Sequence, residues 1–221
     1  AGLGQEAIAG IGFITPIFMI LNGVSVGLGS GATSSISRFV GAKNHKKASQ
    51  SAAHSLLIFL IASVVLTIVL LILQEPLLKL YGASGESLAQ GIKYGTPLFL
   101  GLFAFIFANG ASGILRGEGD MKRAMYAVVV SVILNAILDP ICIYILGWGS
   151  AGAAIATILS SICSAIVILY WILVKKDTYV DVNLGEFKFD SSIAKDILKV
   201  GIPASMDMLV MSIAMSLYMI F

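Results

Sequence analysis

One carboxylate lies inside a long apolar stretch near the middle of the chain. Asp139 follows Asn135 by one helical turn and directly precedes Pro140. A charge at membrane depth costs between about 2.5 and 17 kcal/mol, depending on the method, so an ionisable residue there indicates a function. Asn135 and Asp139 share a helix face because they are four residues apart. Pro140 has no N–H to offer the carbonyl of Ala136, so a helix kink is expected at Pro140.

The chemistry that these groups could do is cation binding. Carboxylate, amide and freed carbonyl oxygens within one helical turn suit a hard cation such as Na⁺. Burial favours the protonated form of a carboxyl group, which would instead make Asp139 a proton carrier. The structural alternative is a carboxylate that only hydrogen-bonds Asn135 and holds helices together. We predict a Na⁺ or H⁺ site at Asp139 and Asn135, with Pro140 as its bending point.

Asp207 is a second acid in an apolar segment, four residues after Pro203. It could be a second coupling site, a cavity-lining cation binder, or a first-turn acid that interacts with the helix dipole. The methionines around Met211 would suit an adaptable hydrophobic cavity, although plain packing is the simpler explanation. Asp207 and Met211 are therefore candidates for lining a cavity only.

The composition excludes a soluble protein. The 221 residues are 58% hydrophobic and 12% charged, with a mean hydropathy of +0.97, whereas soluble domains carry about 25% charged residues. The net charge of +2 provides no footprint for nucleic acid. Apolar runs long enough to span a membrane are predicted within 7–37, over 51–73, 94–115, 124–146 and 150–174, and from about 200 to 221. We predict an all-α, polytopic transmembrane helical bundle with about five complete spans and one truncated span.

Other features are expected to be structural. Gly23, Gly27 and Gly31 recur every fourth residue, which would let one helix face approach a neighbour closely. His45 and His54 are expected to be solvated or interfacial. No nucleophile–base grouping is apparent, so we predict no enzyme activity and no cofactor beyond the coupling ion. The chain opens without Met and stops inside an apolar run, so we expect a fragment of a longer protein.

Basic residues predict the orientation in the membrane. Successive connections between spans lie on alternate sides of the membrane, and 12 of the 14 Lys and Arg residues fall in the connections on one side. Loops rich in basic residues face the cytoplasm. The chain is therefore expected in the plasma membrane with residue 1 outside. The loops expected in the cytoplasm are 38–50, 116–123 and 175–199.

Two motif matches are rejected on their context. Residues 147–152 match the dinucleotide pattern G-x-G-x-x-G, but they join two membrane spans without a strand or a partner acid. Residues 117–120 read GEGD, as in intramembrane aspartyl proteases, and Asp139 could be the second carboxylate. Basic neighbours place Asp120 in a loop, and 19 helical residues would separate it from Asp139 by about 28 Å. A tight turn and a loop acid are expected instead.

Two longer stretches resemble the multidrug and toxic compound extrusion (MATE) transporters. They are LRGEGDMKRAM at 115–125 and NAILDPICIYILGWGSAGAAIAT at 135–157, supported by the stretches at 38–48 and 201–205. The resemblance implies two six-helix lobes, and this chain would hold the second to sixth helices of the N-lobe and the start of the seventh. The implied division is an N-lobe bundle over 1–175, a cytoplasmic linker over 176–196, and the start of the C-lobe over 197–221.

The resemblance also implies cation-coupled antiport of amphipathic, often cationic, organic compounds by alternating access. Such small molecules and the lipid bilayer would be the partners, and the full-length protein would be a monomer. Asn135 and Asp139 would form a Na⁺/H⁺ site together with Thr157 and the backbone of Ala153. Asp139, Asn135 and Thr157 would then be the side-chain ligands of Na⁺. The first helix normally adds another Asp that is absent here, which would leave the site incomplete.

Three other functions stay open. A flippase of lipid-linked precursors, from the same superfamily, would be expected to have a broad basic cavity. The predicted spans contain no Lys or Arg, which favours a cationic or neutral cargo. An intramembrane aspartyl protease is disfavoured by the position of Asp120. A non-transporting scaffold would explain the small-residue faces but gives no reason for Asp139.

Overall fold

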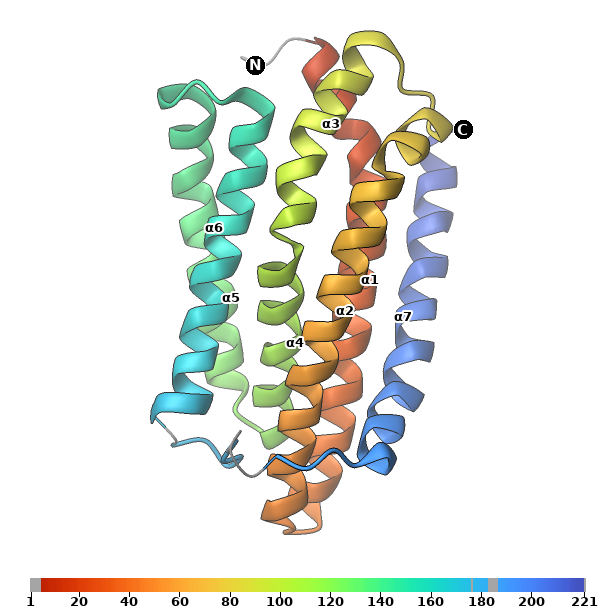
Figure 1. Ribbon diagram of the computed structural model, residues 1–221. Helices are drawn as coiled ribbons and strands as arrows, with labels where there is room; N and C mark the ends of the chain where they lie inside the picture. Colours follow the sequence, from red (N-terminus) through yellow and green to blue (C-terminus); the bar gives the residue numbers. More distant parts are fainter. Residues whose placement is uncertain (1–4, 176, 183–186, 221) are drawn as a thin grey trace.

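The computed structural model describes residues 5–175, 177–182 and 187–220, and within these ranges the chain is helical with no strand. Long helices run side by side in one bundle (Figure 1). In chain order they are α1 (Gln5–Gly41), α2 (His45–Leu80), α3 (Gly85–Leu100), α4 (Leu102–Glu118), α5 (Met121–Pro140), α6 (Gly149–Leu169) and α7 (Ser191–Ile220). Two π-helical turns, Ile141–Ile145 and Tyr170–Lys175, extend α5 and α6.

The predicted membrane bundle is confirmed. Among the described residues, α1, α2, α5 and α6 are each long and apolar enough to cross a membrane. The pair α3–α4 forms a fifth span that is bent by 50° at Gly101. The side chain of Ile158 of α6 packs against the bend, because a Cβ on Gly101 would overlap it. α7 begins at Ser191, inside the segment assigned to the linker, and the division into lobes stays a prediction.

The predicted small-residue face of α1 packs against α7. A Cβ on Gly23 would lie 2.8 Å from the Cβ of Met208, and one on Gly27 would lie 2.5 Å from the backbone nitrogen of Ser205. One turn further on, a Cβ on Gly31 would overlap the carbonyl oxygen of Ile197. Only glycine lets the two backbones approach this closely, so this face joins the first described helix to the last.

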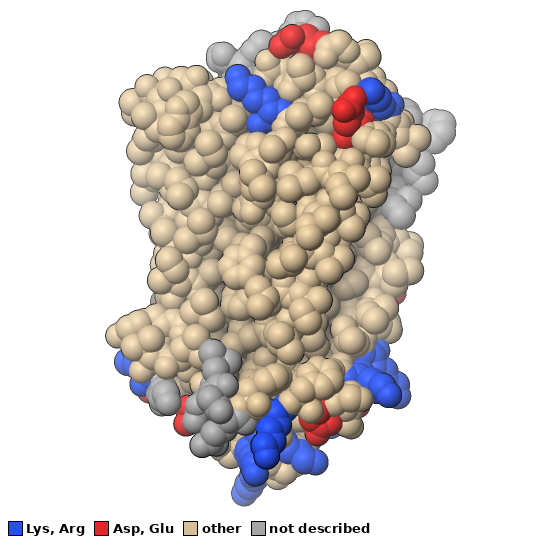
Figure 2. All heavy atoms as spheres, in the orientation of Figure 1, with Lys and Arg blue, Asp and Glu red and all other residues tan. Residues whose placement is uncertain are grey.

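On the face shown in Figure 2, charged residues gather at the two ends of the bundle, and the surface between them is almost free of charge. The α1–α2 connection, the α4–α5 connection and the segment after α6 meet at one end, which we call the basic end (Figure 1). This distribution agrees with a multi-pass membrane protein. The prediction that the basic end faces the cytoplasm follows from the positive-inside rule.

An ion-pair cluster holds the ends of α5 and α6 together there. Arg123 contacts Asp120 at 3.3 Å and Asp177 at 2.7 Å, and Lys175 contacts Asp177 at 2.9 Å. The ammonium group of Lys175, followed by the Arg123 guanidinium, holds the pKa of Asp177 below its usual range. A lowered folded-state pKa contributes stability at pH above about 4, and this stability is lost as the pH falls through the lowered pKa.

The segment after α6 is docked on α2 by His54, which contradicts the expectation of a solvated histidine. His54 is 1% exposed, and its Nε2 accepts a hydrogen bond from the backbone N–H of Asp190 at 2.7 Å. Its Nδ1 is 2.7 Å from the carbonyl oxygen of Gln50, so Nδ1 carries the proton. The rings of Phe187 and Phe189 pack against the imidazole. His45 is exposed, as expected.

Replacing His54 with Phe is expected to loosen this docking while keeping the ring packing. The backbone N–H of Asp190 would lose its partner, at a cost of about 1–3 kcal/mol, which corresponds to opening on the order of ten times more often. Trypsin cleavage after Lys188 should accelerate accordingly. His45→Phe is the matched control, because among the described residues the His45 ring contacts the segment by packing on Tyr179, and phenylalanine keeps that ring contact. Equal cleavage rates in both variants would contradict a docking role for His54.

Candidate cation site

A short turn fixes how α5 and α6 face each other. Gly147 and Gly149 adopt positive φ angles of 68° and 57°, and the tight turn expected from the sequence falls at residues 146–148, just before α6 begins at Gly149. Just after the turn, a Cβ on Gly152 would lie 2.5 Å from the carbonyl oxygen of Cys142. α6 therefore lies almost in backbone contact with the end of the α5 span. This contact sets which α6 residues lie opposite Asp139.

The four predicted site residues lie together across the α5–α6 seam. The amide nitrogen of Asn135 is 3.5 Å from Asp139 Oδ1 and 3.4 Å from Thr157 Oγ1. Thr157 Oγ1 donates to the carbonyl oxygen of Ala153 at 3.0 Å. Asn135, Asp139 and Thr157 are all half-buried. Carboxylate, amide, hydroxyl and backbone carbonyl thus meet at one point between two helices.

The hydrogen bonds at this point are long, which leaves the Asp139 carboxylate weakly satisfied. Contacts of 3.4 and 3.5 Å from Asn135 are at the outer limit of hydrogen bonding. An amide flip would place the Asn135 oxygen where its nitrogen lies, adding a further acceptor. Oxygens of these four kinds suit Na⁺, and a lone carboxylate at this depth also suits H⁺. The residues present therefore fit either ion, and their role as its site stays a prediction.

The helix type changes at Pro140, where a kink was expected, and the kink itself stays a prediction. The α-helical pattern ends at Pro140, and the π-helical turn Ile141–Ile145 follows it directly. Leu146 N–H donates to the Ile141 carbonyl at 2.9 Å, which closes this wider turn. The span Met121–Ile145 remains continuous across the proline. Single π turns inside α-helices are frequent at functional sites, and this one lies directly beyond Asp139.

A contact between α3 and α6 was missed by sequence reasoning. Ser150 of α6 donates to the side-chain oxygen of Gln90 at 3.3 Å, which connects α3 to α6. No spacing within α6 carries a signal for this contact, because its partner Gln90 lies on another helix, 60 residues earlier.

Asp207 and Met211 do not join this cluster. Both are exposed on α7, and Met211 is 65% exposed. α7 packs on α1, on the opposite side of the bundle from α5 (Figure 1). Their role in lining a cavity stays a prediction.

Asp120 also lies far from Asp139, at the start of α5, where its carboxylate caps the helix by accepting from Arg123 N–H at 3.0 Å. The two acids therefore form no protease dyad.

Comparison with known proteins agrees with this arrangement. The MatE family model matches residues 1–141. The multidrug export protein MepA of Staphylococcus aureus is 30% identical over 200 residues, covering 90% of this chain and 44% of its own length. The probable multidrug resistance protein YoeA of Bacillus subtilis is 28% identical over 219 residues, covering 96% of this chain and 47% of its own. The chain therefore spans about half the length of these relatives.

Solved structures show the same arrangement of helices. A crystal structure of MATE in the bent conformation is 46% identical, with a TM-score of 0.93 over 96% of this chain and 47% of that one. The family consists of transporters and not enzymes, as the sequence predicted. The family model, the relatives and the shared fold all lead to one conclusion: this chain belongs to the MATE family of membrane transporters.

Proposed function

We propose that the chain forms half of a secondary active multidrug exporter. Entry of Na⁺ or H⁺ would drive the exit of amphipathic, often cationic, organic compounds by alternating access. Family membership and the names of the relatives support export of organic compounds. The single observation that supports cation coupling is the meeting of Asp139, Asn135 and Thr157 across the α5–α6 seam.

The coupling step follows from the electrostatics of Asp139. An ionised carboxylate at membrane depth carries a large desolvation cost, which binding of H⁺ or Na⁺ removes. An ion at Asp139 would compete with the long hydrogen bonds from Asn135 and would draw on the oxygens of Thr157 and Ala153. These groups belong to two helices, so occupancy changes how α5 and α6 are held together. Such a difference can bias a lobe between outward- and inward-facing states.

Basic residues within the spans would favour the alternative function, a flippase of lipid-linked precursors. Contrary to the expectation of spans without Lys or Arg, α4 continues to Glu118 and includes Arg116. Arg116 is half-buried, donates to Ser112 Oγ at 2.8 Å, and lines a cavity of about 160 Å³ between α4, α5 and α6. One arginine near the basic end is not a broad basic cavity. A cationic or neutral cargo remains the better match.

Transport by the purified full-length protein in liposomes tests this proposal. Ethidium movement would be followed by fluorescence while a Na⁺ gradient and a pH gradient are imposed separately. At least one inward cation gradient should accelerate outward ethidium movement several-fold over the condition with no gradient. Collapse of that gradient with an ionophore should remove the acceleration. Ethidium movement that is indifferent to both gradients would contradict cation coupling.

A further inference from the structure

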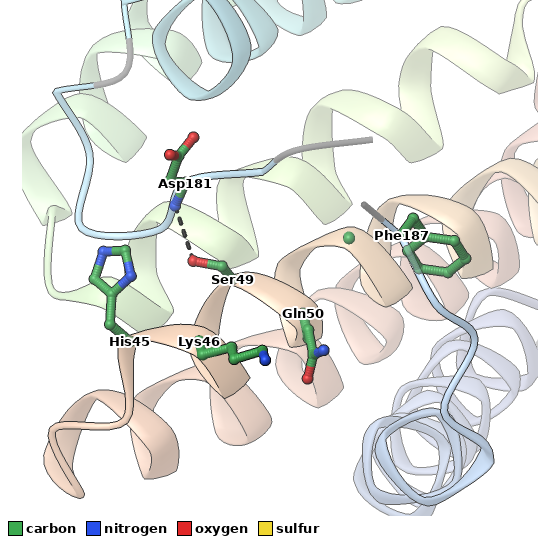
Figure 3. Close-up of a pocket in the computed structure, with 7 residues that line it drawn as sticks. His45, Lys46, Ser49, Gln50, Asp181 and Phe187 are labelled. Carbon is green, nitrogen blue, oxygen red and sulfur yellow. Dashed lines mark hydrogen bonds between the residues drawn. The ribbon is translucent and has the colours of Figure 1, made fainter. Parts of the chain in front are cut away.

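The first two turns of α2 form one wall of a polar pocket of about 400 Å³ at the basic end (Figure 3). His45, Lys46, Ser49 and Gln50 line it from α2, and Asp181 lines it from the segment after α6. The backbone N–H of Asp181 donates to Ser49 Oγ at 2.9 Å, which fixes this segment against the helix. In Figure 3 the Asp181 carboxylate points away from Lys46. The Ser49 hydroxyl keeps its own proton to donate.

An apolar groove of about 370 Å³ begins where the polar pocket ends. Ala53 and Phe187 line both cavities, so the two adjoin. The groove lies between α2, α4 and α6, with Leu60, Phe103 and Leu173 among its walls. The exposed fractions of Leu60 and Phe103, 43% and 44%, show that the groove is open on the membrane-facing side of the bundle.

Both cavities follow one stripe of α2. The α2 residues that line them, from Lys46 through Ala53 to Leu60, recur at intervals of three and four and so face one side. Lys46 and Leu60 are about 21 Å apart along the helix, and the apolar part after Ala53 covers about 10 Å. One leaflet contributes about 15 Å of hydrocarbon. The stripe is therefore polar first and then apolar, in the order of a lipid headgroup and its acyl chain, and its apolar part covers about two-thirds of the hydrocarbon depth of one leaflet.

A second apolar groove has no basic residue in its described lining and serves as a comparison. It measures about 390 Å³ and lies between α2 and α7, with Ile61, Val65 and Leu198 among its walls. None of the described residues that line it is Lys or Arg. Acyl chains of any lipid would fit it, but nothing there would select a headgroup. Of these two grooves, as lined by described residues, the one beside α4 and α6 adjoins a pocket that contains a lysine.

One cation and one acid line the polar pocket, Lys46 and Asp181, and the acid is turned away from the cation (Figure 3). The connection between α1 and α2 contains no acid. Arg38 is paired with Asp196, and Lys47 lies 5.7 Å from the centre of the Phe39 ring. Among the described residues Lys46 has no acidic partner, and it lines the pocket. Basic pockets between helices at the cytoplasmic surface bind the headgroups of anionic lipids.

We propose that this site binds one anionic phospholipid from the leaflet at the basic end. Its phosphate contacts the Lys46 ammonium and accepts from the Ser49 hydroxyl. One acyl chain lies in the groove against Leu60 and Phe103, and the Phe187 ring marks the boundary between the two. Such a lipid touches α2, α4, α6 and the docked segment at once, so it also stabilises that docking. The inference is independent of the coupling ion and of the exported compound.

Native mass spectrometry of the full-length protein in detergent tests the headgroup. Phosphatidylglycerol should be retained in preference to phosphatidylcholine of the same chain length. Lys46→Gln should weaken phosphatidylglycerol binding about fivefold, the contribution of one lysine near a charged membrane surface. Lys47→Gln is the matched control, because Lys47 is adjacent and equally charged but lies outside the pocket, and it should retain most of the binding. Equal retention of the two lipids, or equal loss in the two variants, would overturn the proposal.

A second measurement tests the groove. Phosphatidylglycerol with six-carbon chains should bind at least about tenfold more weakly than the long-chain lipid, because each buried CH₂ contributes about 0.8 kcal/mol. Soluble glycerol phosphate should not displace the long-chain lipid at equal concentration. Displacement by glycerol phosphate, or equal affinity for short and long chains, would show a free-phosphate site instead and would refute the lipid.

Discussion

Asp139→Asn is expected to abolish cation-driven transport. The asparagine keeps the size of the side chain but removes the charge that a proton or Na⁺ neutralises. Removing a residue that only orients the ligands of a metal ion typically lowers the affinity for that ion by about 10–100-fold. Removing the Asp139 carboxylate, which would bind the ion directly, should therefore reduce gradient-driven ethidium efflux by at least that factor. The measurement is efflux by the full-length variant in liposomes with each cation gradient imposed separately.

Asp207→Asn is the control for this prediction. It removes the other acid of the apolar segments, which is exposed on α7 and far from the α5–α6 seam. Its cation dependence should match that of the unmodified protein. If Asp139→Asn retained both its efflux and its response to Na⁺ and pH gradients, Asp139 would be the structural carboxylate that we considered as the alternative.

Gly27→Ala is expected to force α1 and α7 apart. The new Cβ would lie 2.5 Å from the backbone nitrogen and 2.7 Å from the Cα of Ser205, and backbone atoms cannot turn aside as a flexible side chain can. Overpacking of this kind costs about 1–3 kcal/mol. We expect a Tm lower by several degrees, measured by thermal unfolding of the purified protein in detergent.

Gly12→Ala provides the matched control on the same helix. A Cβ at Gly12 meets no atom within 4 Å, and alanine favours a helix over glycine by about 1 kcal/mol. Its Tm should therefore stay the same or rise. A Gly27→Ala protein as stable as Gly12→Ala would mean that the α1–α7 seam contributes little to stability.

Part of the site could be predicted from spacing within one helix. Asn135 and Asp139 are four residues apart in an apolar run, and that spacing alone places them on one face. Thr157 and Ala153 came only from the family resemblance, because they lie on the next helix. The turn at 146–148 and the close approach at Gly152 determine which α6 residues face Asp139. No pattern within α5 specifies that register.

His54 shows where sequence reasoning failed. The position of His54 near the start of an apolar helix predicts an interfacial residue. In the structure it accepts a hydrogen bond from a backbone N–H that lies 136 residues further along the chain. A signal was present in the alternation of Phe187, Lys188 and Phe189, because two aromatic residues on one side of an extended segment indicate a docked face. That alternation does not specify the surface on which the segment docks.

The sequence by itself determined the properties that depend on composition and local spacing. These are the membrane-spanning helices, the end that collects the basic residues, the small-residue face of α1 and the Asn135–Asp139 pair. Only the tertiary structure decided which helix meets that glycine face, which residues complete the polar cluster, and that the apolar groove adjoins the pocket lined by Lys46. The physical reason is that each of these contacts joins helices far apart in sequence. Their relative positions are set by packing over the whole bundle, which no single segment encodes.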